Sequence, residues 1–167
     1  LLERVRLTPD TNPFGGTSGE VYLIDLGGQD LIIRDCVIEG TLILRNPGPQ
    51  TRIEGSVAWR PVRSGDPILI VAGDTTPTIT IATDEVPIVE HTLGVDLDGD
   101  EQQESVIASR LEGVLLVDGH VVLSRRPRIA GCLMAQDTVL FTGAQAWIDA
   151  GAVDPGQVPA GFPVDRR

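Results

Sequence analysis

The chain has 167 residues, of which 24 are acidic and 13 basic, and its formal net charge is -11 at neutral pH. This acidic surface repels phosphate backbones, and no basic cluster is interleaved with aromatic residues, so we exclude nucleic acid as a partner. The length suits one domain with a sizeable core. Nineteen glycines, 12 prolines and only 4% aromatic residues are typical of many short strands joined by turns, so we expect an all-β domain.

In chain order, residues 1–20 are polar and rich in turn residues, and we expect them to cap the first structural unit. Residues 84–109 form the longest non-repetitive insertion, and residues 143–167 form a tail rich in Pro and Gly. Within this tail we expect Trp147 to cover the last unit, because an uncovered strand invites edge pairing. Between these segments, alternating apolar residues predict short strands at 21–25, 31–33, 36–44, 68–72 and 78–82.

One strand-like phrase, with a glycine at its fourth position, returns along the chain at 37–44, 52–59, 110–117 and 128–135. The last two copies start 18 residues apart, which suits one coil of a β-helix with short turns. In the third copy the alternation predicts that Leu111, Leu115 and Val117 point inward, and it places Arg110, Glu112 and Leu116 on the outward side. We expect the four copies to stack in register, with aliphatic columns inside.

The repeat predicts a single domain over residues 1–167, folded as a single-stranded right-handed parallel β-helix, a solenoid of about six coils with one long insertion. The right hand follows from the general chirality of parallel crossovers. A β-sandwich or jelly roll is the alternative, since it also has short alternating strands. That alternative does not predict the return of one phrase after 18 residues.

On the outward side, three glutamates share one slot of the repeat, and three arginines lie two positions before it: Glu39, Glu54 and Glu112, with Arg52, Arg110 and Arg128. Carboxylates stacked about 4.8 Å apart could bind a cation or raise one another's pKa. The favoured interpretation is a solvated face of Arg–Glu pairs, each worth less than about 1 kcal/mol.

The insertion holds one motif with metal-binding chemistry. Asp96, Asp98 and Asp100 stand at positions 1, 3 and 5 of an acidic loop, and Glu104 stands at position 9, a spacing that converges hard oxygens on Ca²⁺. Position 12 is Ile107, so the bidentate glutamate of an EF-hand is missing. Calcium is the only cofactor that the sequence suggests, and a plain solvated turn is the alternative. A bound ion would stiffen the loop.

No constellation of catalytic residues emerges from the sequence. Cys36 and Cys132 fall in different slots of the repeat, and His91 and His120 are isolated, so we do not expect a zinc site, and the redox state of the thiols stays open. A polysaccharide-active β-helix needs paired carboxylates in a groove lined by aromatics, and a serine hydrolase needs a G-x-S-x-G elbow; neither pattern is present. We therefore expect a protein without catalytic residues that is not an enzyme.

Two resemblances rest on these phrases. The I-x-G-x-L rung, followed by the return at 117–123, resembles the coils of bactofilins, polymer-forming β-helical cytoskeletal proteins of bacteria. The wider order of 22–26, 31–40, 93–96 and 110–119 is similar to uncharacterised bacterial proteins with a prepilin-like N-terminal helix and a β-helical body. The second resemblance implies an exported scaffold domain in the cell envelope or another extracytoplasmic place, linked to pilus-like or secretion-type assemblies. The long insertion and the Pro-rich tail depart from the bactofilin pattern.

Together these observations predict a non-catalytic structural or interaction scaffold, with other proteins or copies of itself as partners and without membrane contact by this fragment. The sequence has its one Met at position 134, so we expect it to be an excised domain. A Ca²⁺-stabilised module that binds a glycan or a protein is the first alternative function. A polysaccharide-active β-helix enzyme is the second.

Overall fold

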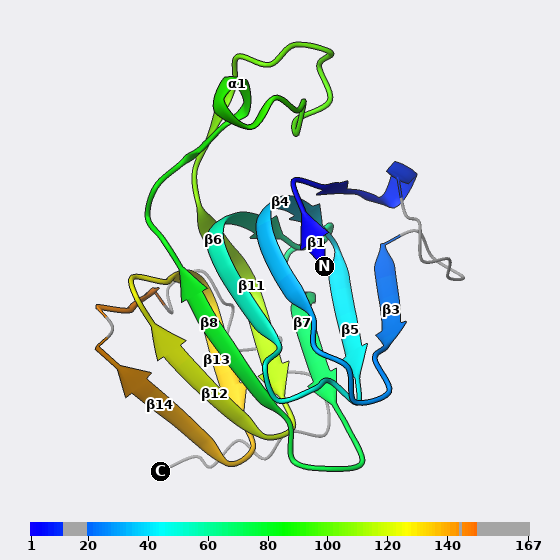
Figure 1. Ribbon diagram of the computed structural model, residues 1–167, viewed down its shortest axis with the longest axis vertical. Coiled ribbons are helices and arrows are strands. Elements are labelled where there is room, and N and C mark those ends of the chain that lie inside the picture. Colours follow the sequence, from blue (N-terminus) through cyan, green and yellow to red (C-terminus); the bar gives the residue numbers. More distant parts are fainter. Residues whose placement is uncertain (12–19, 144, 150–167) are drawn as a thin grey trace.

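The computed structural model describes residues 1–11, 20–143 and 145–149, and this part of the chain is almost entirely β-structure (Figure 1). Its strands are β1 (Leu2–Glu3), β2 (Arg6–Leu7), β3 (Val21–Asp25), β4 (Ile32–Glu39), β5 (Thr41–Arg45), β6 (Arg52–Arg60), β7 (Pro67–Ala72), β8 (Thr78–Thr83), β9 (Ile88–Val89), β10 (Val106–Ile107), β11 (Arg110–Val117), β12 (His120–Ser124), β13 (Arg128–Ala135), β14 (Thr138–Thr142) and β15 (Trp147–Asp149). A 3-10 turn, η1 (Pro9–Thr11), and one short helix, α1 (Glu90–Leu93), complete it. The predicted all-β class is confirmed.

Thirteen of these strands belong to one sheet that does not close on itself, and all its pairs are parallel. Its pairs fall into three stacks. The first stack holds β1, the start of β4, the start of β6, β8, β12 and β14. The second holds β2, the end of β4, the end of β6, the start of β11, the start of β13 and β15. The third holds β3, β5, β7, the end of β11 and the end of β13.

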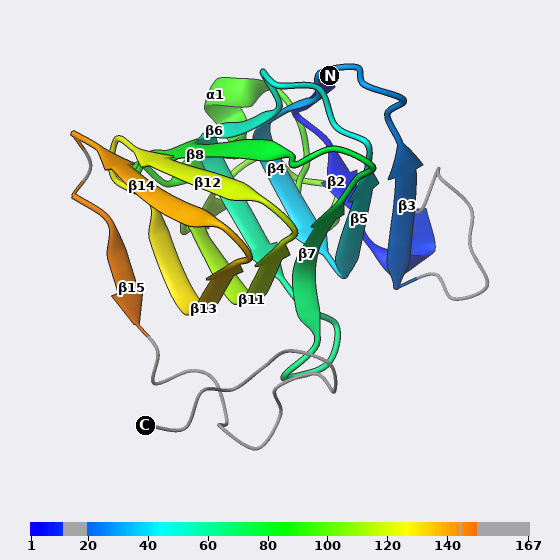
Figure 2. The same ribbon diagram turned by 90° about the horizontal axis from the view of Figure 1, so that it is seen from below.

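The chain visits the three stacks in a constant order, first, second and third, before it returns to the first. Within this large sheet, strands that follow each other in the sequence therefore do not pair, and a strand pairs instead with strands of the neighbouring rounds. Figure 2 shows the result, with β14, β12 and β8 side by side in one layer and β13 and β11 side by side in another.

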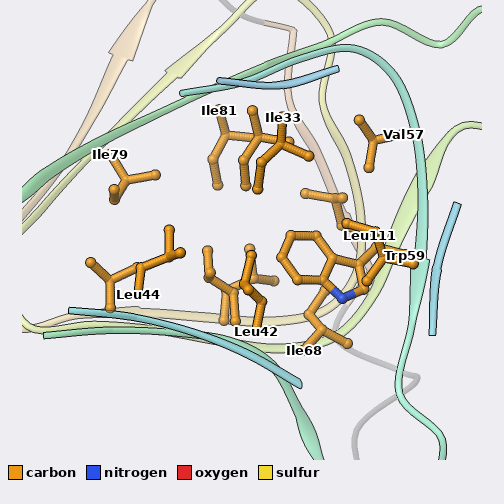
Figure 3. Close-up of a cluster of buried hydrophobic side chains, with 14 of the residues drawn as sticks. Ile33, Leu42, Leu44, Val57, Trp59, Ile68, Ile79, Ile81 and Leu111 are labelled. Carbon is orange, nitrogen blue, oxygen red and sulfur yellow. The ribbon is translucent and has the colours of Figure 1, made fainter. Parts of the chain in front are cut away.

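The core lies between the stacks and consists of aliphatic side chains that repeat from strand to strand. In the first stack the buried, register-matched residues are Ile33, Ile53, Ile81 and Leu123. In the second they are Leu7, Ile38, Trp59, Leu111 and Ile129, and in the third Tyr22, Leu42, Leu69 and Leu115. Figure 3 shows members of all three stacks pointing toward one another, among them Ile33 and Ile81, Trp59 and Leu111, and Leu42. Such burial contributes about 1.5–3 kcal/mol for each large aliphatic side chain.

Two aromatic residues satisfy their polar atoms inside this core. The Trp59 indole Nε1 donates to the carbonyl of Gly40 at 3.0 Å, and the Tyr22 hydroxyl donates to the carbonyl of Glu39 at 2.6 Å. Burial, helped by the negative charge of Glu39, raises the pKa of Tyr22 to about 12. Aromatic side chains thus enter an aliphatic core at no cost in unpaired polar groups.

The predicted stacking of the repeated phrase is right for its last two copies. Leu111 pairs with Ile129, and Gly113 lies beside Gly131. The inward direction of Leu111, Leu115 and Val117 is also confirmed, since all three belong to the buried core. Leu116, expected on the outward side, is only 5% exposed, so its side chain is covered and not solvated.

The first two copies do not stack as predicted. Ile53 pairs with Ile33, not with Ile38, and Ile38 pairs with Trp59. The reason is that β4 and β6 each run through two stacks, and the glycine of the second copy, Gly55, lies at the irregularity opposite Asp35 between those stacks. The second copy therefore resembles the other copies in local sequence only, and this resemblance does not determine which residues it pairs with.

Other expectations fall differently. The short helix α1 lies at Glu90–Leu93, within the insertion. Trp147 does not cover the last unit, because it lies in β15 beside Arg128 with 66% of its surface exposed. Most of the expected tail, like part of the opening segment, lies outside the described residues.

Replacing Gly131 with Ala tests the close approach of neighbouring strands. A Cβ at this position would overlap the backbone carbonyl of Gly113, so we expect G131A to lower the free energy of unfolding by about 3 kcal/mol in urea titrations. G27A is the matched control, since Gly27 has φ +53° and nothing within 4 Å of the added methyl. It should cost only the backbone strain of about 1–2 kcal/mol, and equal losses in both variants would contradict the proposed overlap.

Candidate functional site

The insertion leaves the regular stacks between β8 and β11, and in Figure 1 it projects beyond the ends of these strands with α1 at its tip. Its two ends are tied together by Ser109. The Ser109 hydroxyl donates to the carbonyl of Asp84 at 2.7 Å and accepts the N–H of Val57 at 3.1 Å. Further out, β9 and β10 form an antiparallel ribbon. The insertion therefore rises from a fixed base on β6.

Glu90 organises the tip of the insertion. Its side chain is completely buried, and one carboxylate oxygen accepts the N–H groups of Leu97 at 2.5 Å and Asp98 at 2.9 Å. The other oxygen accepts the N–H of Ser105 at 3.1 Å. A buried carboxylate is tolerated because these donors replace water, and removing it would leave several N–H groups unpaired. Leu97, held by this network, is also buried.

The predicted calcium ligands separate into two groups. Among the described residues, oxygens of Glu90, Asp96 and Asp98 lie within 4.8 Å of one another, whereas Asp100 and Glu104 do not belong to this group. Sequence spacing alone missed Glu90. The one feature of the sequence that could have pointed to Glu90 is its place directly after the apolar pair at 88–89.

The loop carboxylates already bind the loop backbone. Asp96 accepts the N–H groups of Gly99 at 2.5 Å and Glu101 at 2.9 Å, and Asp98 accepts the N–H of Asp100 at 3.2 Å. The Ser105 hydroxyl donates to Asp98 at 2.5 Å, and this hydrogen bond is the main reason that the pKa of Asp98 lies below its usual value. The regular spacing of Asp residues in this loop is therefore explained without a metal ion, because each Asp side chain can accept a hydrogen bond from a backbone N–H group a few residues later.

A cleft of about 300 Å³ lies between the insertion and the outer face of the second stack. Its floor is a row of register-matched residues on adjacent strands, Arg6, Val37, Ala58 and Arg110. Beside that row lie Glu39, Arg60 and Glu112, each two residues further along its strand. The insertion contributes Leu97, Asp98, Ile107 and Ala108.

Ion pairs neutralise most of the charge on these faces. Arg60 pairs with Glu39, and Arg110 pairs with Glu112. In the first stack, Arg34 bridges Glu3 at 2.5 Å and Glu54 at 3.6 Å, while Arg52 contacts Glu54 at 2.7 Å. The predicted Arg–Glu pairing is confirmed for Arg52 and Arg110, but Glu54 lies in a different stack from Glu39 and Glu112. Glu39 and Glu112 therefore enter the cleft as partners of arginines.

The thiols lie apart from this cleft. Cys36 and Cys132 are both free, and burial raises the pKa of each thiol. The Cys36 thiol donates to the carbonyl of Arg34 at 3.0 Å. Thiols that stay protonated are poor nucleophiles, so neither position has the environment of a reactive cysteine.

The two ends of the stacks differ. At the C-terminal end, Phe141 continues the buried row of Leu123, and Ile148 continues the row of Ile129, yet they are 56% and 43% exposed. Leu140 and Trp147 on the same strands are also exposed. At the other end the corresponding residues, Leu7 and Tyr22, are 1% and 0% exposed. Within the part of the chain that the structure describes, the interior is thus covered at one end and open at the other.

No protein-family model, curated protein or solved structure matches this chain. Among its described residues, no helix has the length and apolar character needed to cross a membrane. The resemblances to bactofilins and to prepilin-like proteins stay predictions.

Glu90→Gln tests the role of the buried carboxylate. The amide offers one acceptor oxygen in place of two, so at least one N–H group at the tip loses its partner, at a cost of about 1–3 kcal/mol. We expect faster hydrogen exchange at the amides of Leu97, Asp98 and Ser105, with the exchange of β11 and β13 unchanged. The control is E104Q, at an exposed carboxylate. Equal exchange in the two variants would rule out the organising role of Glu90.

Calcium binding at the acidic loop stays a prediction. It is checked by the melting temperature of the protein in about 1 mM Ca²⁺ against excess chelator, because an ion that binds only the folded state raises this temperature. If Asp98 is a ligand, D98N abolishes the rise and E104Q retains it, since Glu104 lies outside the carboxylate group. Equal melting temperatures with and without Ca²⁺ would leave the loop as a solvated turn.

Proposed function

We propose that this domain is a right-handed parallel β-helix of about six coils that serves as a non-catalytic interaction scaffold. The coil assignment is supported by the constant order in which the chain visits the three stacks. In this proposal each visit to all three stacks is one coil, and the residues between β8 and β11 are a loop inserted into the fourth coil. The hand follows from the general chirality of parallel crossovers.

The observation that carries the scaffold function is the open C-terminal end. Phe141 and Ile148 occupy core positions but face solvent over about half of their surface, and Leu140 and Trp147 extend the apolar area. In the described part of the chain, β14 pairs only with β12, so its other edge is unpaired. Unpaired backbone groups beside exposed core residues form a template for another strand layer.

We assign this end to a second copy of the chain. Two copies meeting end to end would present the same apolar residues to each other, as an isologous interface requires. The edge strand β14 supports this assignment because Thr138–Thr142 contains no charge and no proline, the devices by which edge strands usually avoid such pairing. An envelope location, in a pilus-like or secretion-type assembly, is supported only by the resemblance of the sequence phrases.

The scaffold function is tested by the association of the protein in solution. We expect sedimentation to show a dimer at micromolar concentration, and we expect the double variant L140K/F141K to weaken dimerisation at least about tenfold, because charges would replace the apolar contact. L23K is the matched control, since Leu23 is 48% exposed on β3 at the opposite end. A wild-type protein that stays monomeric at about 100 μM, or equal weakening by L23K, would overturn the assignment.

A further inference from the structure

The cleft beneath the insertion lies between two parts of the chain that are far apart in sequence. Its floor comes from β2, β4, β6 and β11, and its other wall comes from Leu97 and Asp98 at the tip of the insertion. The tip is held in place, because Glu90 binds the backbone of both residues. A volume of about 300 Å³ lies at the lower end of the range for small-ligand sites.

The charges in this cleft leave one cation and one anion without a counter-charge. Three arginines and three carboxylates line it, and four of these six groups neutralise each other as the pairs Arg60–Glu39 and Arg110–Glu112. Arg6 and Asp98 remain. Within the described ranges neither forms an ion pair, with each other or with another residue, although the Arg6 guanidinium rests against Gly99, the residue after Asp98.

Between these two charged groups and the paired ones, the lining is apolar. Val37 and Ala58 form the floor, and Ile107 and Ala108 stand on the side of the insertion. A ligand that fits this lining carries a carboxylate for Arg6, an ammonium group for Asp98 and an aliphatic body between the walls. Guanidinium binds carboxylate through two parallel hydrogen bonds, which gives this end of the cleft its selectivity.

We propose that the cleft binds a small zwitterion with an apolar side chain, of the class of an aliphatic α-amino acid or a short peptide. Such a ligand has no net charge, so the formal charge of -11 on the protein does not repel it, as it would a phosphate or a polyanion. This site is separate from the open C-terminal end, and neither proposal depends on the other.

The test uses leucine and the dipeptide Leu-Gly as probes, in the presence of chelator so that no divalent cation competes for Asp98. Leucinamide lacks the carboxylate, and N-acetylleucine lacks the ammonium group. In amide-resolved NMR titrations we expect leucine or Leu-Gly to shift the signals of Val37, Ala58 and Gly99, and we expect both blocked compounds to bind at least about tenfold more weakly.

Two variants identify the site. R6Q should weaken binding of leucine at least about tenfold and leave the weak binding of leucinamide unchanged, because leucinamide has no carboxylate for Arg6 to bind. Equal loss for leucine and for leucinamide contradicts the role of Arg6. A58F places a large side chain on the floor of the cleft and should abolish binding. R45Q, at an exposed arginine on β5, is the control that should bind as the wild type does.

The proposal is overturned if no probe shifts these signals at about 10 mM, the range of the weakest specific binding. It is also overturned if R6Q and R45Q bind leucine equally. Dimerisation measured on the same variants separates the two proposals, since A58F should leave the open end and its association unchanged.

Discussion

Parallel pairing between strands of successive rounds is the constraint on which the rest of the structure depends. The pairing satisfies the backbone groups of each strand and places corresponding residues of successive rounds directly above one another. Because the inward positions lie in the core, each of them must be apolar in every round. The rows from Ile33 to Leu123 and from Leu7 to Ile129 show this requirement. The same requirement creates the open end, because in the described part of the chain β14 exposes both the core residue Phe141 and an unpaired edge.

This architecture also explains how a long insertion is accommodated. Residues 84 and 109 are neighbours because Ser109 bridges Asp84 and β6, so the intervening chain closes a loop without displacing a strand. The entropic cost of closing a loop grows only slowly with its length, so a long insertion with a fixed base destabilises the fold little more than a short one would. The buried Glu90 then supplies the hydrogen bonds that a core would otherwise provide at the tip.

The sequence predicted what depends on local alternation and on an exact repeat. The strands around 21–25, 68–72 and 78–82 and the register of 110–117 with 128–135 were available from side-chain periodicity. The register of 52–59 was not, because its phrase matches the others while its strand bends at Gly55 between two stacks. The cleft was also beyond reach, since Arg6 and Asp98 are brought together only by the folding back of the insertion.

The open end and the cleft both result from the stacking of the strands, in different ways. At the end, stacking stops and leaves an apolar surface, which we propose is covered by a second copy of the chain. In the cleft, stacking places Arg6, Val37, Ala58 and Arg110 in a row across four strands, and the paired charges beside the row leave Arg6 and Asp98 unmatched. A ligand bridging these two groups would connect the first strands of the chain to the insertion. It would thereby stabilise the folded state according to its concentration and affinity, without adding to the core.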